Sequence, residues 1–482
     1  MKITRANLNI TEKYPIKIIQ FGEGNFLRAF VDYAFHKLNK EFRFNAGIAV
    51  IQPIEKGMVE ILKQQEGLYT LFMNGVKKGE KIQKKELITN IVKTNNPYLE
   101  FGEMLNLAHE EELAFVISNT TEAGIAYVES DTAEMTPPSS YPAKLTLLLY
   151  ERFKFFGGKK DKGLSIIPCE LINYNADTLK EIILKYIEDW KLGNEFKIWI
   201  LESNSFHNTL VDRIVPGYPK DEIELYNKQL NYQDNLLITA ESFFLWVIEG
   251  DEKLKEKLPF HKTKLDVKIV ESIQPYRNRK VRILNGAHTS IVPLSIMYGN
   301  ETVEQTMNCE FTLNFIKNLV VNEIIETLEM DKNELLNFAE EVFDRFRNPF
   351  IKHYLSTIAL NSVSKFKVRV LSGIEEFQQK KGYLPKHIVF SFAALIRFYK
   401  GTWNDKQLPL DDEASILNEF NEIWKLKNYS EIAEKTLGKI EFWGKDLNAI
   451  VGLTSEISKA LLLIDTHGVE VGFTYFKSKV IF

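Results

Sequence analysis

Short apolar segments alternate with amphipathic ones along the first half of the chain. Segments rich in β-branched and other apolar residues, a composition that favours strands, occur at residues 16–21, 47–51, 113–119, 164–168 and 197–202. Between several of them, apolar residues recur three and four positions apart, as on the buried face of a helix, for example at 143–155 and 178–190. This alternation predicts a parallel sheet with crossover helices. The lysine-rich segment 77–86 predicts a solvent-exposed hairpin.

The pattern changes after a last strand-like segment at residues 265–272. Helical periodicity then dominates, at residues 310–329, 332–347, 387–399, 414–424 and 446–463. A chain of 482 residues is also too long for one hydrophobic core, so two domains are expected. We therefore predict an α/β domain at residues 1–270 and a mostly α-helical domain at residues 271–482.

A glycine turn follows the first predicted strand. Gly22 and Gly24 separate this strand from an amphipathic helix that begins near Phe26. A strand, a glycine turn and a helix in this order are typical of a Rossmann-like dinucleotide-binding domain, in which the backbone closely approaches the pyrophosphate. Leu27 stands where a third glycine is usual, and glycine pairs also form simple strand-to-helix turns. Both interpretations therefore remain open from this segment alone.

A second segment, at residues 278–290, carries a lysine, an amide and a histidine. At ~100° per residue on an α-helix, His288 lies about 80° and Asn285 about 140° from Lys280, so the three share one side. Arg282, at about 200°, points away from Lys280. A lysine held among apolar neighbours loses hydration, which disfavours its charged form and suits it to proton transfer near neutral pH. Ordinary surface residues would give the same spacing.

Composition excludes several other classes of function. The net charge is −4, so no basic field favours nucleic acid. The two cysteines cannot build a disulfide framework, and no local His or Cys spacing predicts a metal site. The N-terminal residues lack the layout of a signal peptide, and no apolar run reaches the ~18–20 residues of a membrane span. We expect a cytoplasmic protein.

Taken together, the motifs resemble those of the polyol-specific long-chain dehydrogenases, or mannitol dehydrogenase family. Gly22, Gly24, Phe26 and Arg28 match the motif that forms the glycine turn in that family. Its lysine motif is matched by Lys280, Arg282, Leu284, Asn285 and His288. Shorter matches fall between them, at residues 121–124 and 210–214.

The resemblance implies metal-independent catalysis with NAD, in which Lys280, Asn285 and His288 are the catalytic residues. It also implies a set of cofactor-binding residues around the glycine turn and a second turn: Ile19, Phe21, Gly22, Gly24, Asn25, Phe26, Arg28, Thr121 and Glu122. The second predicted strand does not end in the usual acidic residue that binds the adenosine ribose, because Gln52 stands there. Glu55 could substitute for that acid, whereas Lys56 could favour a 2′-phosphate.

Further details at residues 140–146 and 167–172 resemble members of the family that act on sugar acids. One departure is Leu171, which replaces the family's second oxyanion-hole asparagine; Asn173 and Asn175 lie nearby. The resemblance implies interconversion of tagaturonate and altronate. The alternatives are fructuronate with mannonate, a neutral polyol such as mannitol, and a non-catalytic sensor of NAD(H).

A sugar-acid substrate requires a cation that binds its carboxylate. Lys365 and Arg369 lie four residues apart, so on a helix they would share a face and could form such a site. A solvated basic face is the competing interpretation. Arg282 is the other candidate for substrate binding, although its position on the helix turns it away from Lys280.

Overall fold

The computed structural model describes residues 2–121 and 123–478, and these form two compact units. The first unit comprises residues 2–74 and 81–273, and the second comprises residues 75–80 and 274–478. The chain therefore passes from one unit to the other at three places along its length.

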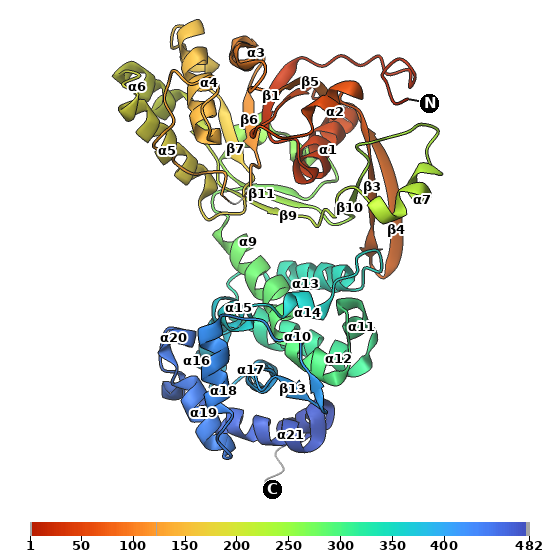
Figure 1. The fold of residues 1–482 in the computed structure, drawn as a ribbon, viewed down its shortest axis with the longest axis vertical. Coiled ribbons are helices and arrows are strands. Elements are labelled where there is room, and N and C mark those ends of the chain that lie inside the picture. Colours follow the sequence, from red (N-terminus) through yellow and green to blue (C-terminus); the bar gives the residue numbers. More distant parts are fainter. Residues whose placement is uncertain (1, 122, 479–482) are drawn as a thin grey trace. The chain divides into compact units, whose positions relative to one another are not determined.

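A six-stranded parallel sheet forms the centre of the first unit, in the order β5-β2-β1-β6-β7-β8 (Figure 1). Its strands are β1 (Ile16–Phe21), β2 (Gly47–Ile51), β5 (Ile91–Asn95), β6 (Phe115–Ser118), β7 (Ser165–Pro168) and β8 (Ser205–Phe206). Most of their residues are apolar and buried because helices cover both faces, as is usual for parallel sheets. The predicted α/β, Rossmann-like fold class is confirmed.

Successive residues of β1 face opposite sides of this sheet. Ile18 packs in the core that also contains Phe30 of α1 (Asn25–Phe42). Ile19 and Phe21 instead pack in the second core, with apolar residues of α4 (Tyr141–Phe155) and α5 (Asn175–Asp189). Two smaller helices, α2 (Val59–Gln64) and α3 (Phe101–Asn106), complete the connections between these strands. The expected helices at 143–155 and 178–190 correspond to α4 and α5.

The strand expected at residues 197–202 is wrong, because these residues belong to α6 (Asn194–Ser203). The buried side chains of α6 are Phe196, Trp199 and Ile200, spaced three and four apart. This is the period of a helix, and it outweighs the short apolar run that suggested a strand.

Two smaller sheets complete the first unit. One contains β3 (Tyr69–Lys77), β4 (Glu80–Ile88) and β10 (Ile238–Glu241), and the other contains β9 (Thr209–Asp212), β11 (Leu245–Glu249) and β12 (Val267–Val270). The short helices α7 (Ile223–Asn227) and α8 (Glu252–Lys257) lie in the intervening segments. β12 confirms the strand expected at 265–272, whereas β5 and β8 to β11 were not anticipated.

β3 and β4 form the hairpin that was expected at residues 77–86. Its tip, residues 75–80, belongs to the second unit. There the backbone N–H groups of Lys78 and Gly79 donate hydrogen bonds to the carboxylate of Asp344, at 2.5 and 3.3 Å.

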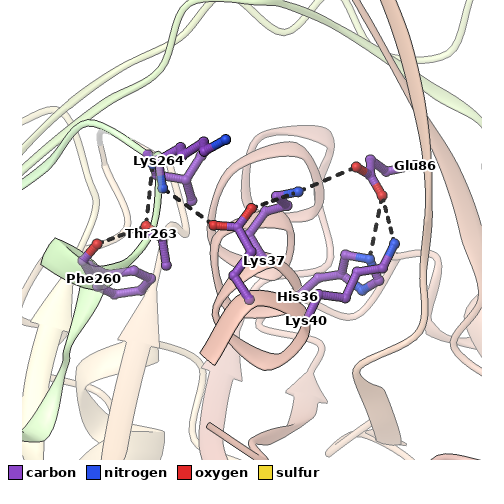
Figure 2. Close-up of polar contacts among 9 residues, drawn as sticks. His36, Lys37, Lys40, Glu86, Phe260, Thr263 and Lys264 are labelled. Atoms are coloured by element: carbon purple, nitrogen blue, oxygen red, sulfur yellow. Dashed lines mark hydrogen bonds and ion pairs between the residues drawn. The ribbon is translucent and has the colours of Figure 1, made fainter. Parts of the chain in front are cut away.

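At the other end of β4, Glu86 joins the hairpin to α1. Figure 2 shows its carboxylate facing three basic side chains of α1: His36 at 3.8 Å, Lys37 at 3.5 Å and Lys40 at 3.1 Å. These groups lower the pKa of Glu86 to about 2, and His36 makes the largest contribution. The ion cluster thus fixes the hairpin to the helix that the glycine turn opens.

The second unit is mostly helical, as predicted. Its first half contains α9 (Gln274–Arg279), η5 (Lys280–Asn285), α10 (Gly286–Tyr298), α11 (Val303–Asn308), α12 (Glu310–Asn318), η6 (Leu319–Ile324), η7 (Ile325–Thr327), α13 (Lys332–Phe346) and α14 (Leu355–Ile358). Its second half contains α15 (Ser362–Arg369), α16 (Ser372–Lys381), α17 (Lys386–Phe398), a small hairpin of β13 (Thr402–Trp403) and β14 (Lys406–Gln407), α18 (Ala414–Ile423), α19 (Tyr429–Leu437), α20 (Ile440–Trp443) and α21 (Leu453–Lys477).

α17 is the central helix of this unit and packs against α10 and α21 (Figure 1). Every residue from Ile388 to Phe398 is buried, so this helix is covered on all sides. α13, α17 and α18 match the helices expected at 332–347, 387–399 and 414–424. The expected helix at 310–329 is divided into α12, η6 and η7, and α21 begins later than the expected residue 446. Within residues 2–121 and 123–478, no helix combines the length and apolar character needed to cross a lipid bilayer.

The ion cluster at Glu86 predicts a pH-dependent contribution to stability. Because its pKa is about 2 in the folded protein and near 4.5 in the unfolded chain, the stabilisation is complete above pH 4.5 and is lost as the pH falls towards 2. Glu86 is partly exposed, so solvent screening limits the contribution to about 1 kcal/mol. Glu86→Gln should therefore lower the free energy of unfolding at pH 7 by about this amount, and by progressively less below pH 4.5.

Urea unfolding followed by circular dichroism at pH 7 and pH 3 measures this difference. Glu80→Gln, on the exposed part of the same strand, is the control and should change stability by less than about 0.5 kcal/mol at either pH. An equal loss for Glu86→Gln at both pH values would contradict the electrostatic explanation.

Candidate active site

The glycine turn after β1 requires Gly22. Its φ is +121°, and an added Cβ would lie 2.8 Å from the carbonyl oxygen of Asn119, which follows β6. The Gly22 N–H also donates to the Ile51 carbonyl at the end of β2. A side chain at this position would therefore collide with the sheet edge.

Gly24 is the N-cap of α1 and makes no side-chain capping bond. No heavy atom of the described residues, apart from its chain neighbours, lies within 4 Å of the position that a Cβ would occupy. The first N–H groups of a helix lack partners within the helix and attract anions. The turn therefore fits the pyrophosphate of a dinucleotide, which needs both this space and these donors.

Arg28 lies beneath the turn rather than on its surface. Its guanidinium is buried and donates to the Glu23 and Leu236 carbonyls and to the Asn25 side chain, at 3.1, 2.7 and 2.8 Å. Arg28 thus holds the backbone of the turn, and its predicted part in cofactor binding stays a prediction.

Four other predicted cofactor residues surround the turn. Ile19 and Phe21 are buried in the core beneath it, and Phe26 stacks on Phe30 with ring centroids 4.8 Å apart. The Asn25 side chain is fixed by Arg28 and lies against Gly217. Their direct contact with cofactor stays a prediction.

The loop after β2 is preorganised by Gln52 and Glu23. The Gln52 amide donates to the Ile54 and Glu55 carbonyls, both at 2.9 Å, so its donor group is used within its own loop. Glu23 accepts a hydrogen bond from the Met58 N–H at 3.2 Å, and burial raises the pKa of Glu23. Glu55 and Lys56 are both exposed on this loop, where a dinucleotide's ribose normally binds.

The turn after β6 contains a strained residue. Thr121 has a φ of +95°, which is uncommon for a threonine, and an added Cβ on Gly124 would lie 2.0 Å from the Thr120 hydroxyl. Strain of this kind is often found at functional sites. Glu122, the other predicted residue of this turn, lies outside the described residues.

The end of β7 does not supply the missing oxyanion-hole asparagine through Asn175. The Asn175 amide donates to the Pro168 and Glu170 carbonyls and its oxygen accepts from the Thr209 N–H, so the side chain is used in the backbone network. Leu171 is 61% exposed. These hydrogen bonds give Asn175 a structural role.

In the second unit, the predicted catalytic motif begins in a π-helix. α9, η5 and α10 form one continuous helical segment, and the Gly286 N–H bonds to the Val281 carbonyl five residues earlier. The α-helical angles expected for this motif do not apply across η5. Because π-helical hydrogen bonds join residues five apart, Asn285 and Lys280 lie closer to one face of the helix than the ~140° of an α-helix would place them.

Arg282, within the same π-helix, is directed to other helices. Its guanidinium donates to the Ser372 hydroxyl at 2.8 Å and the Thr327 hydroxyl at 3.0 Å, and forms an ion pair with Glu376 at 3.0 Å. Arg282 is buried. These partners indicate a structural role, and its part in substrate binding stays a prediction.

His288 lies between two rings. Phe346 of α13 stacks on it with centroids 4.0 Å apart, and His353 meets it nearly perpendicularly at 5.2 Å. Its Nε2 is buried and has no hydrogen-bond partner among the residues that the structure describes. Burial and the nearby His353, Arg345 and Arg369 hold the pKa of His288 well below its usual range, so the imidazole is neutral at pH 7.

The two cations predicted on one helical face both lie on α15. Arg369 donates to the hydroxyl of Thr289, the neighbour of His288, at 3.2 Å, and Lys365 donates to the Ile358 carbonyl at 3.0 Å. Burial first, and then the charge of Arg369, lowers the pKa of Lys365. Neither cation has a carboxylate within 4.0 Å in the described part of the chain.

Sequence reasoning did not identify Arg345, Phe346 and His353. They lie about sixty residues after the lysine motif, and no local spacing connects them to it. Only the packing of α13 and the segment after it against α10 brings them to His288. The second unit therefore combines a lysine, an amide, a neutral imidazole and several cations, which can transfer a proton and bind an anion.

Comparisons with known proteins relate both units to one family. The family model for the mannitol dehydrogenase Rossmann domain matches residues 16–262, and that for the mannitol dehydrogenase C-terminal domain matches residues 272–465. Relatives called altronate oxidoreductase, from Yersinia pestis and Cronobacter sakazakii, are each 44% identical over 461 residues. The alignments cover 94% of this chain and 95% of each relative.

Two solved structures share the fold at low sequence identity. D-sorbitol dehydrogenase in substrate-free form has a TM-score of 0.79 at 20% identity, covering 95% of both chains. The ternary complex of Pseudomonas fluorescens mannitol 2-dehydrogenase with NAD and D-mannitol has a TM-score of 0.65 at 19% identity, covering 100% of both chains.

Proposed function

The chain belongs to the mannitol dehydrogenase family, and we propose that it is an NAD-dependent oxidoreductase that interconverts D-tagaturonate and D-altronate. The altronate oxidoreductases that align with nearly the whole chain support this substrate pair. Hydride transfer to a ketone or from a secondary alcohol is the reaction of the family, and the glycine turn of the first unit fits the dinucleotide that it requires.

The observation that carries the choice of a sugar acid is the pair of cations on α15. A neutral polyol has no group that needs two half-buried cations, whereas a carboxylate gains charge-assisted hydrogen bonds from them. Arg369 is tied to the residue after His288, so the carboxylate end of a substrate would be bound on the side of His288 that faces α15.

Bound NADH supplies the hydride in the direction of reduction. Lys280 then gives a proton to the oxygen that is reduced from carbonyl to hydroxyl, and it takes the proton back in the reverse reaction. Asn285, one π-turn above Lys280, donates a hydrogen bond to the same oxygen, and a preorganised donor of this kind lowers the barrier by ~3 kcal/mol. His288, being neutral, holds a hydroxyl of the substrate.

Three alternatives remain distinct from this proposal. Fructuronate and mannonate differ from tagaturonate and altronate only in configuration, and would use the same residues. A neutral substrate such as mannitol would leave the cations of α15 without a role. A non-catalytic sensor of NAD(H) would need the glycine turn but not Lys280, Asn285 and His288.

A substrate panel tests the proposed function. We expect NADH oxidation with D-tagaturonate to exceed that with D-fructuronate, and both to exceed that with neutral ketoses such as D-fructose. NADPH serves as the control for cofactor choice, because Glu55 would favour the free ribose of NADH whereas Lys56 would favour the 2′-phosphate of NADPH. Turnover confined to fructose or mannitol would exclude a sugar-acid reductase, and tight NADH binding without any turnover would favour the sensor.

Removal of the lysine tests the proton transfer. Lys280→Ala should lower kcat by about 10²–10⁴-fold, because a general acid contributes that much, while the Kd for NADH stays nearly unchanged. Lys280→Arg keeps the charge but holds its proton too tightly to donate it, so it should be similarly slow. Steady-state kinetics and NADH fluorescence titration measure the two quantities. An alanine variant with more than about a tenth of wild-type turnover would contradict this role.

Replacement of Arg369 tests the binding of the carboxylate. Arg369→Met should raise the KM for the keto acid by about 10–100-fold, the effect of losing a charge-assisted hydrogen bond, without a matching change in the KM for NADH. Lys367→Met, which removes a neighbouring cation of the same helix, is the control. If both variants behave like the wild type, the carboxylate is bound elsewhere, with Arg282 as the next candidate.

A further inference from the structure

His353 is held in a fixed position beside His288. Its carbonyl accepts a hydrogen bond from the Val303 N–H at 3.0 Å, and the Leu355 N–H donates to the Glu301 carbonyl at 2.9 Å. Thr302 and Tyr354 form the antiparallel bridge between these two bonds. The backbone on both sides of His353 is therefore restrained, although the residue lies between helices.

The ring of His353 also has a defined orientation. It meets the His288 ring at 88°, with the centroids 5.2 Å apart, while Phe346 covers His288 with an interplanar angle of 15°. His353 is partly buried and so remains accessible from one side. The two imidazoles therefore lie edge to face, directly beside each other.

The charges around this site are mostly positive. Burial is the main cause that lowers the pKa of His353, and the charge of Arg345 lowers it further. The charges of Arg345 and Arg369 likewise lower the pKa of His288. The charged groups of the surrounding elements are Arg345 and, one turn earlier, Glu341 on α13, Arg369 on α15, Lys352 in the segment itself and Glu301 across the bridge. No carboxylate of the described residues lies within 4.0 Å of either imidazole.

We infer that His353 binds the carboxylate of the substrate, together with Arg369, and that it takes up one proton from solvent when a sugar acid binds. This inference rests on the proposed function, since it concerns the same substrate. The neutral imidazole of His353, near the charge of Arg345, resists protonation, but an anion at the same place compensates the added charge. His353 would then be a specificity-determining residue, because a neutral ketose or polyol provides no such compensation.

Proton uptake gives a direct test in the wild-type protein. Calorimetric titration of the NADH-bound enzyme with D-altronate, a pair between which no hydride can be transferred, at pH 7.5 in buffers of different ionisation enthalpy, measures the protons exchanged on binding. We expect net uptake approaching one proton per altronate bound, and none with the neutral polyol D-altritol. Binding of altronate with no dependence on the buffer would overturn the inference.

His353→Gln assigns this proton. The amide keeps a hydrogen-bond donor but cannot take a charge. We expect the proton uptake to disappear, the KM for D-tagaturonate at pH 7 to rise by about 10–100-fold, and the KM for NADH to stay within about 2-fold. The wild-type KM for tagaturonate should also increase between pH 6 and 8, and this dependence should be lost in the variant.

His467→Gln is the matched control, because His467 is an exposed histidine of α21 that contacts Tyr475. It should retain the proton uptake and the KM of the wild type. Uptake that persists in His353→Gln would overturn the assignment to His353. If the wild type reduces no hexulosonate at all, the proposed function itself fails. If the wild type is active but exchanges no protons when altronate binds, only the inference about His353 fails.

Discussion

The backbone hydrogen bond from the Gly286 N–H to the Val281 carbonyl closes the π-turn that sets the spacing of Lys280 and Asn285 along their helix. It includes one more residue in the turn than an α-helix allows, and a π-turn is a rare conformation that persists where the surroundings support it. Here the support comes from Arg282, which is bonded to Ser372, Thr327 and Glu376. Gly286 adds to it, because a Cβ there would lie only 3.3 Å from the Arg369 carbonyl. The close approach of α15 and the π-turn therefore depend on the same few residues.

The strands of the central sheet could be predicted because each is a short, nearly continuous apolar run, the pattern that burial on both faces imposes. Residues 197–202 have the same local composition, yet the chain forms α6, because Phe196, Trp199 and Ile200 pack with a helical period. The lysine motif could likewise be recognised, but its π-helical geometry could not, since an extra residue in a turn leaves no mark on hydrophobic spacing. His353 and Phe346 reach His288 only through tertiary packing. Local sequence therefore predicts elements well and long-range neighbours poorly.

The motif residues of the first unit differ in how they serve a cofactor. Gly22 and Gly24 leave space at the turn, whereas the Arg28 guanidinium is bonded to protein oxygens beneath it. Glu23 and Gln52 similarly direct their side chains into the loop after β2. A dinucleotide site of this kind is mostly a backbone surface, and its charged side chains keep that surface rigid. A residue can thus be characteristic of such a motif without touching the ligand.

The hairpin of β3 and β4 has a consequence for dissecting this protein into its parts. A fragment that starts at Gln274 is contiguous in sequence, but it omits residues 75–80. Asp344 would then lose the two N–H donors of Lys78 and Gly79, directly before Arg345 and Phe346 at the end of α13. The folding unit is therefore not a single contiguous segment of the sequence. A fragment intended to fold independently needs a tethered copy of this six-residue loop, or a circularly permuted chain that retains it.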